Sequence, residues 1–389
     1  MKIAIFHNRY KVSGGEDFVF QEESLLLEEK ENVECYEVHN ENIVSRISAV
    51  ITALGVVFNF KVFSWAKRKF KRSPVDVVHV HNYFPLLSPS IFYACKSSNV
   101  ATVHTLHNYR AICPTALLMH RGIIVEDSIK GRCFWTIKEK VYKSSYLGTI
   151  FLSLMVEVHK WIGTWNRTVD RYIALTEFSK RKYVEAGWPA NKIVVKPNFI
   201  KDPFSGAQKI KKKGGFALFV GRLSEEKGIN TLLGAWSSIK LPLKVIGDGP
   251  LRAVVEKIDE DNIDYLGYKN KKEVLGLVKD ADFIVMPSTW YEGFPMVLVE
   301  AFACGTPAIV SKLGSMEEIV KDGVTGLHFE TGSADDLAEK INNLIANPEL
   351  LKSMGENARI EYLDKYTPEK NYEILKDVYR QAIGEANRK

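Results

Sequence analysis

The sequence lacks the features that mark several classes of protein. It has five cysteines in 389 residues, at positions 35, 95, 113, 133 and 304, and no C-x-x-C pair. This spacing argues against a disulfide framework or a zinc ribbon and favours a reducing compartment. No apolar run is long enough to span a bilayer, and Met1–His7 reads as a short strand rather than a signal peptide. We therefore expect a soluble, cytoplasmic chain.

The chain also has no strong excess of one charge. Its 53 Lys and Arg against 47 Asp and Glu give a net charge of +6. This mild excess suits phosphate groups, an anionic membrane surface or nucleic acid without choosing between them. The length fits two domains of roughly 200 residues each.

Two stretches qualify the expectation of a soluble chain. Residues 61–72 interleave six Lys and Arg with Val62, Phe63, Trp65 and Phe70, a pattern suited to an anionic membrane surface and equally to a solvated helix face. Residues 146–162 are apolar but are interrupted by Glu157, His159 and Lys160, which favours a core or interface helix over a membrane contact.

Buried strands and helices alternate along both halves of the chain. This alternation predicts an α/β protein with two Rossmann-like, doubly wound parallel sheets. A polar, irregular stretch at 199–215 reads as a linker. We therefore predict domains at 1–200 and 201–366 that face each other across a cleft, with a final helix at 367–389 packing back on the first domain. The predicted strands are 3–6, 33–38, 75–80, 101–106, 171–175, 216–220, 243–246, 263–266, 283–286 and 308–310, and the predicted helices include 18–29, 334–345, 348–362 and 368–386.

The segment 291–305 carries the strongest functional signal. It follows a buried strand, and Pro295 suits the first position of a short helix that Gly305 would end. Free N–H groups at Met296, Val297 and Leu298 would then form a site for an oxygen-rich or anionic ligand. Glu292 and Glu300 would accept hydrogen bonds from hydroxyls, as a sugar and a ribose offer. An acidic first turn with a later surface Glu is the alternative interpretation.

Two further loops follow strands of the second half. In 221–228, Arg222 and Lys227 offer two standard ways of holding phosphate, although both side chains could instead pair with Glu225 and Glu226. A glycine turn at 247–249 follows the next strand, and by itself it is weak evidence for a site.

The first half has polar residues at the ends of three strands. Gly14 and Gly15 precede a helix and would let backbone approach a phosphate, or they form an ordinary turn. His81 and His107 end two strands and are candidates for orienting an acceptor hydroxyl, with a buried structural role as the alternative for His107. His104 and Cys113 lie nearby, but no ligand spacing supports a metal site, so we predict none.

Taken together, these motifs resemble glycosyltransferase family 4, whose members are retaining enzymes with the GT-B fold. The resemblance covers essentially the whole chain. Its motifs are Ser13-Gly14-Gly15-Glu16-Asp17, Thr105–Arg110 with Cys113-Pro114, Gly221-Arg222-Leu223 with Lys227-Gly228, Gly247-Asp248-Gly249-Pro250, and Glu292-Gly293-Phe294-Pro295 with Glu300-Ala301. Similar enzymes that build bacterial surface polysaccharides tend to carry extra cysteines near Val125 and Ser128, which this chain lacks.

The resemblance implies roles for these residues. The first domain would bind the acceptor and the second the donor. The implied catalytic residues are His107, Glu292, Arg222 and Lys227. The implied donor-binding residues are Gly14, Gly15, Arg222, Lys227, Gly247, Glu292, Gly293, Phe294, Pro295, Met296, Val297 and Glu300. The implied acceptor-binding residues are Glu16, His81, Asn82, Asn108, Tyr109 and Arg110. Such enzymes usually need no metal.

We thus expect a retaining glycosyltransferase that moves a sugar from a nucleoside-diphosphate sugar, with a UDP-sugar as the expected donor, to a hydroxyl of a lipid-linked or oligosaccharide acceptor. The expected context is bacterial cell-surface polysaccharide synthesis, with the chain cytoplasmic and touching the inner membrane face through 61–72. The alternatives are a sugar-nucleotide epimerase on the same fold and a basic nucleic-acid-binding module. We expect no nucleic-acid partner, because 61–72 is the single stretch that interleaves aromatics with Lys and Arg.

Overall fold

A computed structural model describes residues 1–11, 14–42, 45–204, 214–258 and 260–388. Ser13 and most of the predicted linker lie outside the described residues. The chain divides into two compact units, each of which is described by itself. Unit 1 comprises Met1–His120, Ile124–Asn198 and Asn371–Lys389, and unit 2 comprises Arg121–Ile123 and Phe199–Lys370.

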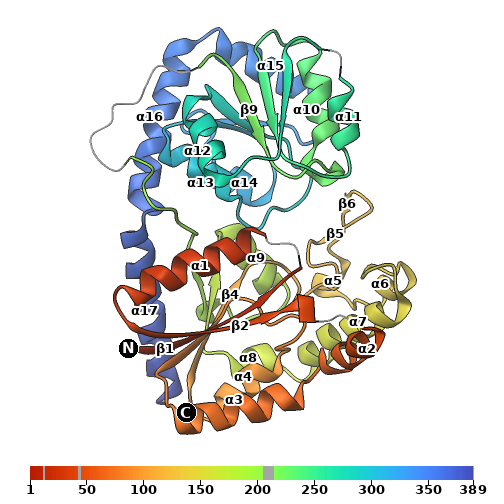
Figure 1. Cartoon of the computed structure of the whole chain (residues 1–389), viewed down its shortest axis with the longest axis vertical. Coiled ribbons are helices and arrows are strands. Elements are labelled where there is room, and N and C mark those ends of the chain that lie inside the picture. Colours follow the sequence, from red (N-terminus) through yellow and green to blue (C-terminus); the bar gives the residue numbers. More distant parts are fainter. Residues whose placement is uncertain (12–13, 43–44, 205–213, 259, 389) are drawn as a thin grey trace. The chain divides into compact units, whose positions relative to one another are not determined.

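Unit 1 is built on a six-stranded sheet, in which every pair of neighbouring strands is parallel (Figure 1). The strand order is β2-β1-β3-β4-β7-β8. The central strands are buried along their whole length because both faces of the sheet are covered. The strands are β1 (Lys2–Arg9), β2 (Asn32–His39), β3 (Val77–Val80), β4 (Ala101–Leu106), β7 (Arg171–Ala174) and β8 (Ile193–Val195).

The last helix of the chain, α17 (Pro368–Ala386), covers one face of this first sheet together with α1 (Gly15–Glu28) (Figure 1). Leu375, Val378, Tyr379 and Ala382 are fully buried in one cluster with residues of β1, β3, β4 and β7. The other elements of this part of the chain are α2 (Arg46–Gly55), α3 (Phe60–Arg72), α4 (Ser90–Ser97), β5 (Met119–His120), β6 (Ile123–Ile124), α5 (Asp127–Lys130), α6 (Trp135–Lys138), α7 (Tyr146–Trp161), α8 (Thr164–Thr168), α9 (Glu177–Glu185) and the 3-10 turns η1 (Asn40–Asn42) and η2 (Ala190–Lys192).

Unit 2 repeats the architecture with the strand order β11-β10-β9-β12-β13-β14, again parallel throughout. Its core packs α10 and α15 against the sheet around the fully buried Trp236. The strands are β9 (Ala217–Val220), β10 (Leu243–Ile246), β11 (Ile263–Gly267), β12 (Phe283–Met286), β13 (Ala308–Ser311) and β14 (Gly326–Phe329). The helices are α10 (Ile229–Trp236), α11 (Arg252–Glu256), α12 (Lys271–Asp280), α13 (Met296–Ala303), α14 (Gly314–Ile319), α15 (Ala334–Ile345) and α16 (Pro348–Lys365), and a 3-10 turn η3 spans Glu225–Lys227.

The two predicted parallel sheets are confirmed, but three local predictions were wrong. The edge strands β8 and β14 were missed because they are only three and four residues long, too short to show a strand pattern. The first helix begins at Gly15 rather than at Phe18. Pro295 has an extended backbone, with ψ of 107°, so it caps α13 and is not its first helical residue.

The two stretches with a candidate membrane role form helices α3 and α7. Ala66 and Phe70 of α3 and Leu152, Met155 and Val156 of α7 are buried in the structure. Within the described residues, no helix alone is long and apolar enough to cross a membrane. Residues 48–55 and 60–72 reach that length and composition only as a pair, and the pair is bent by 68°.

Candidate active site

In unit 2, the loops after β9, β10 and β12 are held together by their backbones. Leu223 donates its N–H to Asp248 O at 2.9 Å, and Leu251 donates to Leu223 O at 2.8 Å. A Cβ on Gly247, which has φ of 142°, would lie 1.8 Å from Gly221 O, and one on Gly228 would lie 1.8 Å from Pro287 O. Only glycine fits such close approaches, so these loops form one preorganised surface at the carboxyl ends of the strands.

Glu292 is the best-anchored acidic side chain of this surface. It is 5% exposed, and its Oε1 accepts hydrogen bonds from Lys227 Nζ at 2.7 Å, Ser288 Oγ at 2.6 Å and Trp290 Nε1 at 3.0 Å. Its backbone carbonyl accepts from Ser315 Oγ. The structure therefore brings together the predicted residues Glu292 and Lys227, and it does not pair Lys227 with Glu225 or Glu226.

Arg222 follows β9 and is exposed. Its guanidinium makes no hydrogen bond or ion pair with any residue that the structure describes, whereas Lys227 lies 5.3 Å above the Trp290 ring and is fixed by Glu292. A fixed ammonium and an unengaged guanidinium on one loop are suited to an anionic group such as a diphosphate.

The start of α13 offers fewer free donors than predicted. Leu298 donates its N–H to Pro295 O at 3.1 Å, so this predicted anion donor is already engaged. Met296 and Val297 begin the helix and are partly exposed, as is Gly293. Phe294 packs edge-on against Tyr366, with ring centroids 6.2 Å apart.

Glu300 lies within α13, one turn after the helix start. Its side chain is partly buried, and this burial raises the pKa of Glu300 against an opposing effect of Lys271. It makes no hydrogen bond to Glu292 or Lys227 in the structure, so the two carboxylates of the segment occupy separate environments.

In unit 1, Gly14 is the residue before α1 and donates its N–H to Asp17 Oδ2 at 2.8 Å. The same Asp17 bonds His7 Nε2 through Oδ1 at 2.7 Å. Gly14 thus closes the start of the helix with its own N–H. At Gly15 a Cβ would meet nothing within 4 Å, so this residue stands open to a ligand.

Glu16 connects two other predicted residues. Its Oε1 accepts from Asn82 Nδ2 at 2.9 Å and its Oε2 from Asn108 Nδ2 at 3.3 Å. Burial, reinforced by the charge of Asp17, raises the pKa of Glu16 to about 8. A carboxyl group that keeps its proton at neutral pH can donate as well as accept a hydrogen bond.

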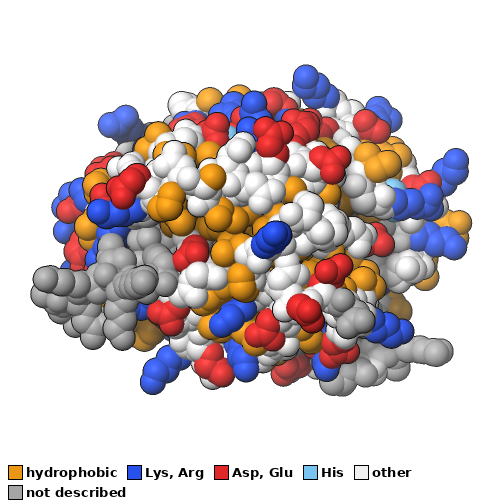
Figure 2. Space-filling model, turned by 90° about the horizontal axis from the view of Figure 1, so that it is seen from above, with side chains coloured by type: hydrophobic (Ala, Val, Ile, Leu, Met, Phe, Trp, Pro, Cys, Tyr) orange, Lys and Arg blue, Asp and Glu red, His pale blue; other side chains and the backbone are white. Residues whose placement is uncertain are grey.

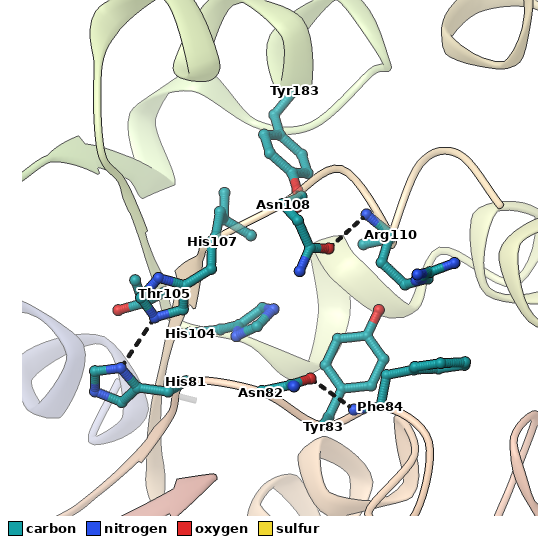
Figure 3. A pocket seen from close by; sticks show the side chains of 12 residues that line it. His81, Asn82, Tyr83, Phe84, His104, Thr105, His107, Asn108, Arg110 and Tyr183 are labelled. Carbon is teal, nitrogen blue, oxygen red and sulfur yellow. Dashed lines mark hydrogen bonds between the residues drawn. The ribbon is translucent and has the colours of Figure 1, made fainter. Parts of the chain in front are cut away.

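His107 contacts His81 (Figure 3), the first of a chain of buried ionisable groups. His107 Nε2 is 3.0 Å from His81 Nδ1, His81 Nε2 is 3.2 Å from Glu23 Oε1, and Glu23 Oε2 is 2.6 Å from Lys196 Nζ. Glu23 and Lys196 are each 1% exposed. Burial alone would raise the pKa of Glu23, but Lys196 and the imidazoles hold it well below its usual value.

These contacts line up the two imidazoles with the carboxylate. His81 Nε2 faces Glu23 Oε1 at 3.2 Å without a hydrogen bond, and one of the two ring nitrogens His81 Nδ1 and His107 Nε2 donates to the other. Burial, with His81 as the second cause, lowers the pKa of His107 well below its usual value.

Glu23, His79 and His81 present ligand atoms close enough together to hold a metal ion. Lys196 at 2.6 Å already supplies the positive charge, and both ring nitrogens of His79 are engaged, Nδ1 with Tyr379 Oη at 2.8 Å and Nε2 with Thr105 Oγ1 at 2.7 Å. The residues present therefore fit an ion-pair network rather than a metal ion.

Tyr109 and Arg110 have different surroundings from the other predicted acceptor residues. Tyr109 is 3% exposed and stacks on Tyr183 at 5.9 Å, which makes it a core residue. Arg110 donates to Pro114 O and lies 4.8 Å above the Phe84 ring. A cavity of about 20 Å³, room for a single water molecule, is lined by Arg110, Phe84 and His107 among others (Figure 3).

Sequence reasoning missed Glu23, Lys196, His7, Ser288 and Trp290. Glu23 lies inside α1 and Lys196 follows the unpredicted β8, so nothing in their sequence neighbourhood marks them as partners. Trp290 and Ser288 stand within four residues of Glu292, and this proximity was the one usable signal.

The basic excess is not gathered into one region of the face shown in Figure 2, where Lys and Arg side chains alternate with Asp and Glu. Such an interspersed surface gives little support to nucleic-acid binding through that face.

Comparisons with known proteins cover both units. The family model of Glycosyltransferase Family 4 matches residues 28–202, and that of Glycosyl transferases group 1 matches residues 201–361. Two uncharacterised glycosyltransferases of Methanocaldococcus jannaschii are 29% identical over 357 residues (89% of this chain, 88% of the relative) and 31% identical over 321 residues (79% and 76%).

Solved structures give the same result for the fold. The Anabaena protein HepE in complex with UDP matches with a TM-score of 0.66 at 18% identity, over 97% of this chain and 99% of that one. The lipopolysaccharide outer core galactosyltransferase WaaB matches with a TM-score of 0.65 at 18% identity, over 96% and 98%. The chain belongs to the family 4 type of glycosyltransferases with the GT-B fold.

Proposed function

We propose that the protein is a retaining glycosyltransferase that uses a nucleoside-diphosphate sugar, with UDP as the expected nucleotide, and extends a lipid-linked or oligosaccharide acceptor in cell-surface polysaccharide synthesis. The observation that carries the proposal is the Lys227–Glu292 pair on backbone-locked loops, beside the unengaged guanidinium of Arg222. A neighbour with bound UDP and another that acts on lipopolysaccharide support the choice of donor and acceptor.

The donor site follows from charge. As the bond between sugar and diphosphate breaks, negative charge grows on the leaving diphosphate, and Arg222 and Lys227 would stabilise it. Glu292 keeps Lys227 in place and would stand, with the backbone of residues 293–297, near the sugar. Glu300 would accept from the ribose hydroxyls, and Gly247 would leave room for the nucleotide. Because Glu292 already accepts from Lys227, Ser288 and Trp290, these residues suit direct stabilisation by cationic side chains, and we propose that no metal is required.

The acceptor site follows from hydrogen bonding. His107 would hold a substrate hydroxyl at Nδ1, the ring nitrogen that does not face His81, while Glu16, Asn82 and Asn108 would contact the acceptor from the neighbouring network. In a retaining reaction without a covalent intermediate, the acceptor oxygen attacks on the face that the diphosphate leaves, and a leaving oxygen takes its proton. His107 then acts as a positioning group rather than as the general base.

We assign acceptor binding to residues 1–200, including the open backbone at Gly15, and donor binding to residues 201–366, with residues 367–389 completing the first domain. We also propose that α3 holds the protein on the inner membrane face, since its last turn carries Lys69, Lys71 and Arg72.

Calorimetry with UDP, GDP and ADP tests the donor site. We expect UDP to bind, Lys227→Met and Arg222→Ala each to weaken binding, and Lys352→Ala, an exposed lysine on α16, to leave it unchanged. The anomeric configuration of the transfer product, read by NMR, tests retention. Equal affinity of wild type and Lys227→Met would disprove the assignment. Isomerisation of the donor without acceptor would instead indicate an epimerase, and steeply salt-dependent RNA or DNA binding a nucleic-acid module.

A further inference from the structure

An apolar groove of about 310 Å³ lies in unit 1, between α2 and α7. Its volume falls at the lower end of the range of small-molecule sites. Most of its lining is hydrocarbon, from Val50, Ala53, Val56, Leu147, Phe151 and Leu152 among others. Nothing in the proposed function so far uses this groove.

The rim of the groove leaves large apolar side chains in water. Val50 is 56% exposed and Leu147 is 67% exposed, and both line the groove. Next to them on α2, Ile51 and Leu54 are each 59% exposed. A contiguous exposed apolar patch around a groove is more often a binding site than the rest of a protein surface is.

One end of the groove meets the candidate acceptor residues. Phe84 lines both the groove and the small cavity beside His107. The Arg110 guanidinium lies 4.8 Å above the Phe84 ring and 5.9 Å from the Tyr142 ring, and Lys143 Nζ lies 5.4 Å from the same Tyr142 ring. Two cations thus flank one aromatic ring at the end of the groove.

These two cations form no ion pair with a carboxylate of the described residues. Arg110 acts on the Glu16 carboxyl by charge alone, and its Nε is buried without a hydrogen-bond partner. Since a buried guanidinium nitrogen without an acceptor is costly, an anionic group at this position would be stabilised. The groove therefore combines a hydrocarbon channel with an anion site at its inner end.

We propose that the groove binds the hydrocarbon chain of an acceptor lipid whose phosphate lies at Arg110 and Lys143. The inference rests on the proposed function and names its acceptor class, a lipid phosphate or diphosphate that carries the sugar to be extended. The chain would run between α2 and α7, while the sugar beyond the phosphate would point toward His107 and Asn108. Charge complementarity and continuity with the acceptor residues select this occupant over a neutral lipid or a peptide helix.

Calorimetry with single-chain alkyl phosphates, used below the concentration at which they aggregate, tests the proposal on the full chain. We expect saturable binding of dodecyl phosphate to one site, with affinity rising about fourfold for each added CH₂ between octyl and dodecyl phosphate. Inorganic phosphate alone should bind far more weakly, and dodecanol, which lacks the anion, should bind at least about tenfold more weakly than dodecyl phosphate.

Two variants on one helix separate the groove from the surface around it. Ala53→Trp fills the groove and should weaken dodecyl phosphate binding at least about tenfold, whereas Leu54→Trp, on the exposed face of α2, should not change it. Lys143→Ala should weaken it about threefold, as expected for an exposed charge. Circular dichroism checks that both tryptophan variants fold.

The outcomes separate this inference from the donor assignment, because UDP binding is measured on the same preparations. UDP binding with no saturable uptake of dodecyl phosphate, or equal uptake by Ala53→Trp and Leu54→Trp, overturns the groove and leaves the transferase intact. Binding to vesicles of anionic lipid that Ala53→Trp does not alter, without binding of the single-chain phosphate, would place the lipid contact on the surface and likewise overturn the groove. Loss of UDP binding in the wild type would instead count against the proposed function.

Discussion

Each unit is built on its own six-stranded parallel sheet, but the groups at the ends of the strands differ in character between the two units. In unit 2, backbone contacts at Gly228 and Gly247 lock loops that present Arg222 to solvent. In unit 1, the strand ends lie over a buried chain of imidazoles, a carboxylate and Lys196. The first arrangement suits a ligand that brings charge, and the second suits one that brings hydroxyls.

The two sites differ in what they cost the free energy of folding. Exposed cations cost the folded state little free energy when no diphosphate is bound, so the site of unit 2 needs only a rigid backbone. Buried ionisable groups must compensate one another within the fold, so unit 1 ties its site to its stability. Mutations should therefore separate function from folding in unit 2 and couple them in unit 1.

Removing Lys196 should destabilise the protein most, because it breaks the buried Lys196–Glu23 pair of unit 1. Lys196→Met leaves the buried Glu23 without the cation that offsets its burial, and we expect the free energy of unfolding to fall by about 3–5 kcal/mol. Urea denaturation followed by circular dichroism measures it. The double variant Glu23→Gln with Lys196→Met removes both charges and should recover part of the loss. A single variant as stable as wild type would contradict the claim that the site of unit 1 rests on this pair.

In unit 2, by contrast, removing a candidate residue should impair catalysis without changing stability. Arg222→Ala removes an exposed cation that contacts no described residue, so the free energy of unfolding should not change. Because this cation would stabilise charge that grows in the transition state, kcat should fall about a hundredfold. Steady-state kinetics with a UDP-sugar measures it, with Lys352→Ala as the matched control. A loss confined to KM would show that Arg222 binds donor and transition state equally.

The same contrast explains what the sequence could predict. The candidate site of unit 2 could be predicted because its residues follow strands in short motifs: Arg222 and Lys227 stand five residues apart after β9, and Glu292 follows β12. Apolar runs predicted most strands, as β9 and β12 illustrate, because parallel strands are covered on both faces.

The network of unit 1 could not be read in this way. Glu23 and Lys196 are 173 residues apart, and each looks like a solvent-exposed charge in its own segment. His107 contacts His81, which lies 3.2 Å from Glu23, so the surroundings of a recognisable histidine rest on partners that no local pattern reveals. The engaged N–H of Leu298 was missed for a related reason, since it depends on the exact backbone angles of Pro295.

The pH dependence of stability through Glu16 of unit 1 should be the weakest of these effects. The pKa of Glu16 is raised to about 8 from a usual value near 4.5, so between these values the folded protein holds a proton that the unfolded chain has lost. The stability that this group contributes is present below about pH 4.5 and is lost as the pH rises toward and through 8. The side chain in Glu16→Gln cannot ionise. The midpoint of urea denaturation of this variant should therefore rise relative to that of wild type as the pH increases across this window. Glu29→Gln, an exposed carboxylate at the end of the same helix, should run parallel to wild type. Parallel curves for Glu16→Gln as well would mean that Glu16 titrates like a solvated carboxylate, and the site of unit 1 would then resemble the exposed site of unit 2 more closely than the contacts of Asn82 and Asn108 imply.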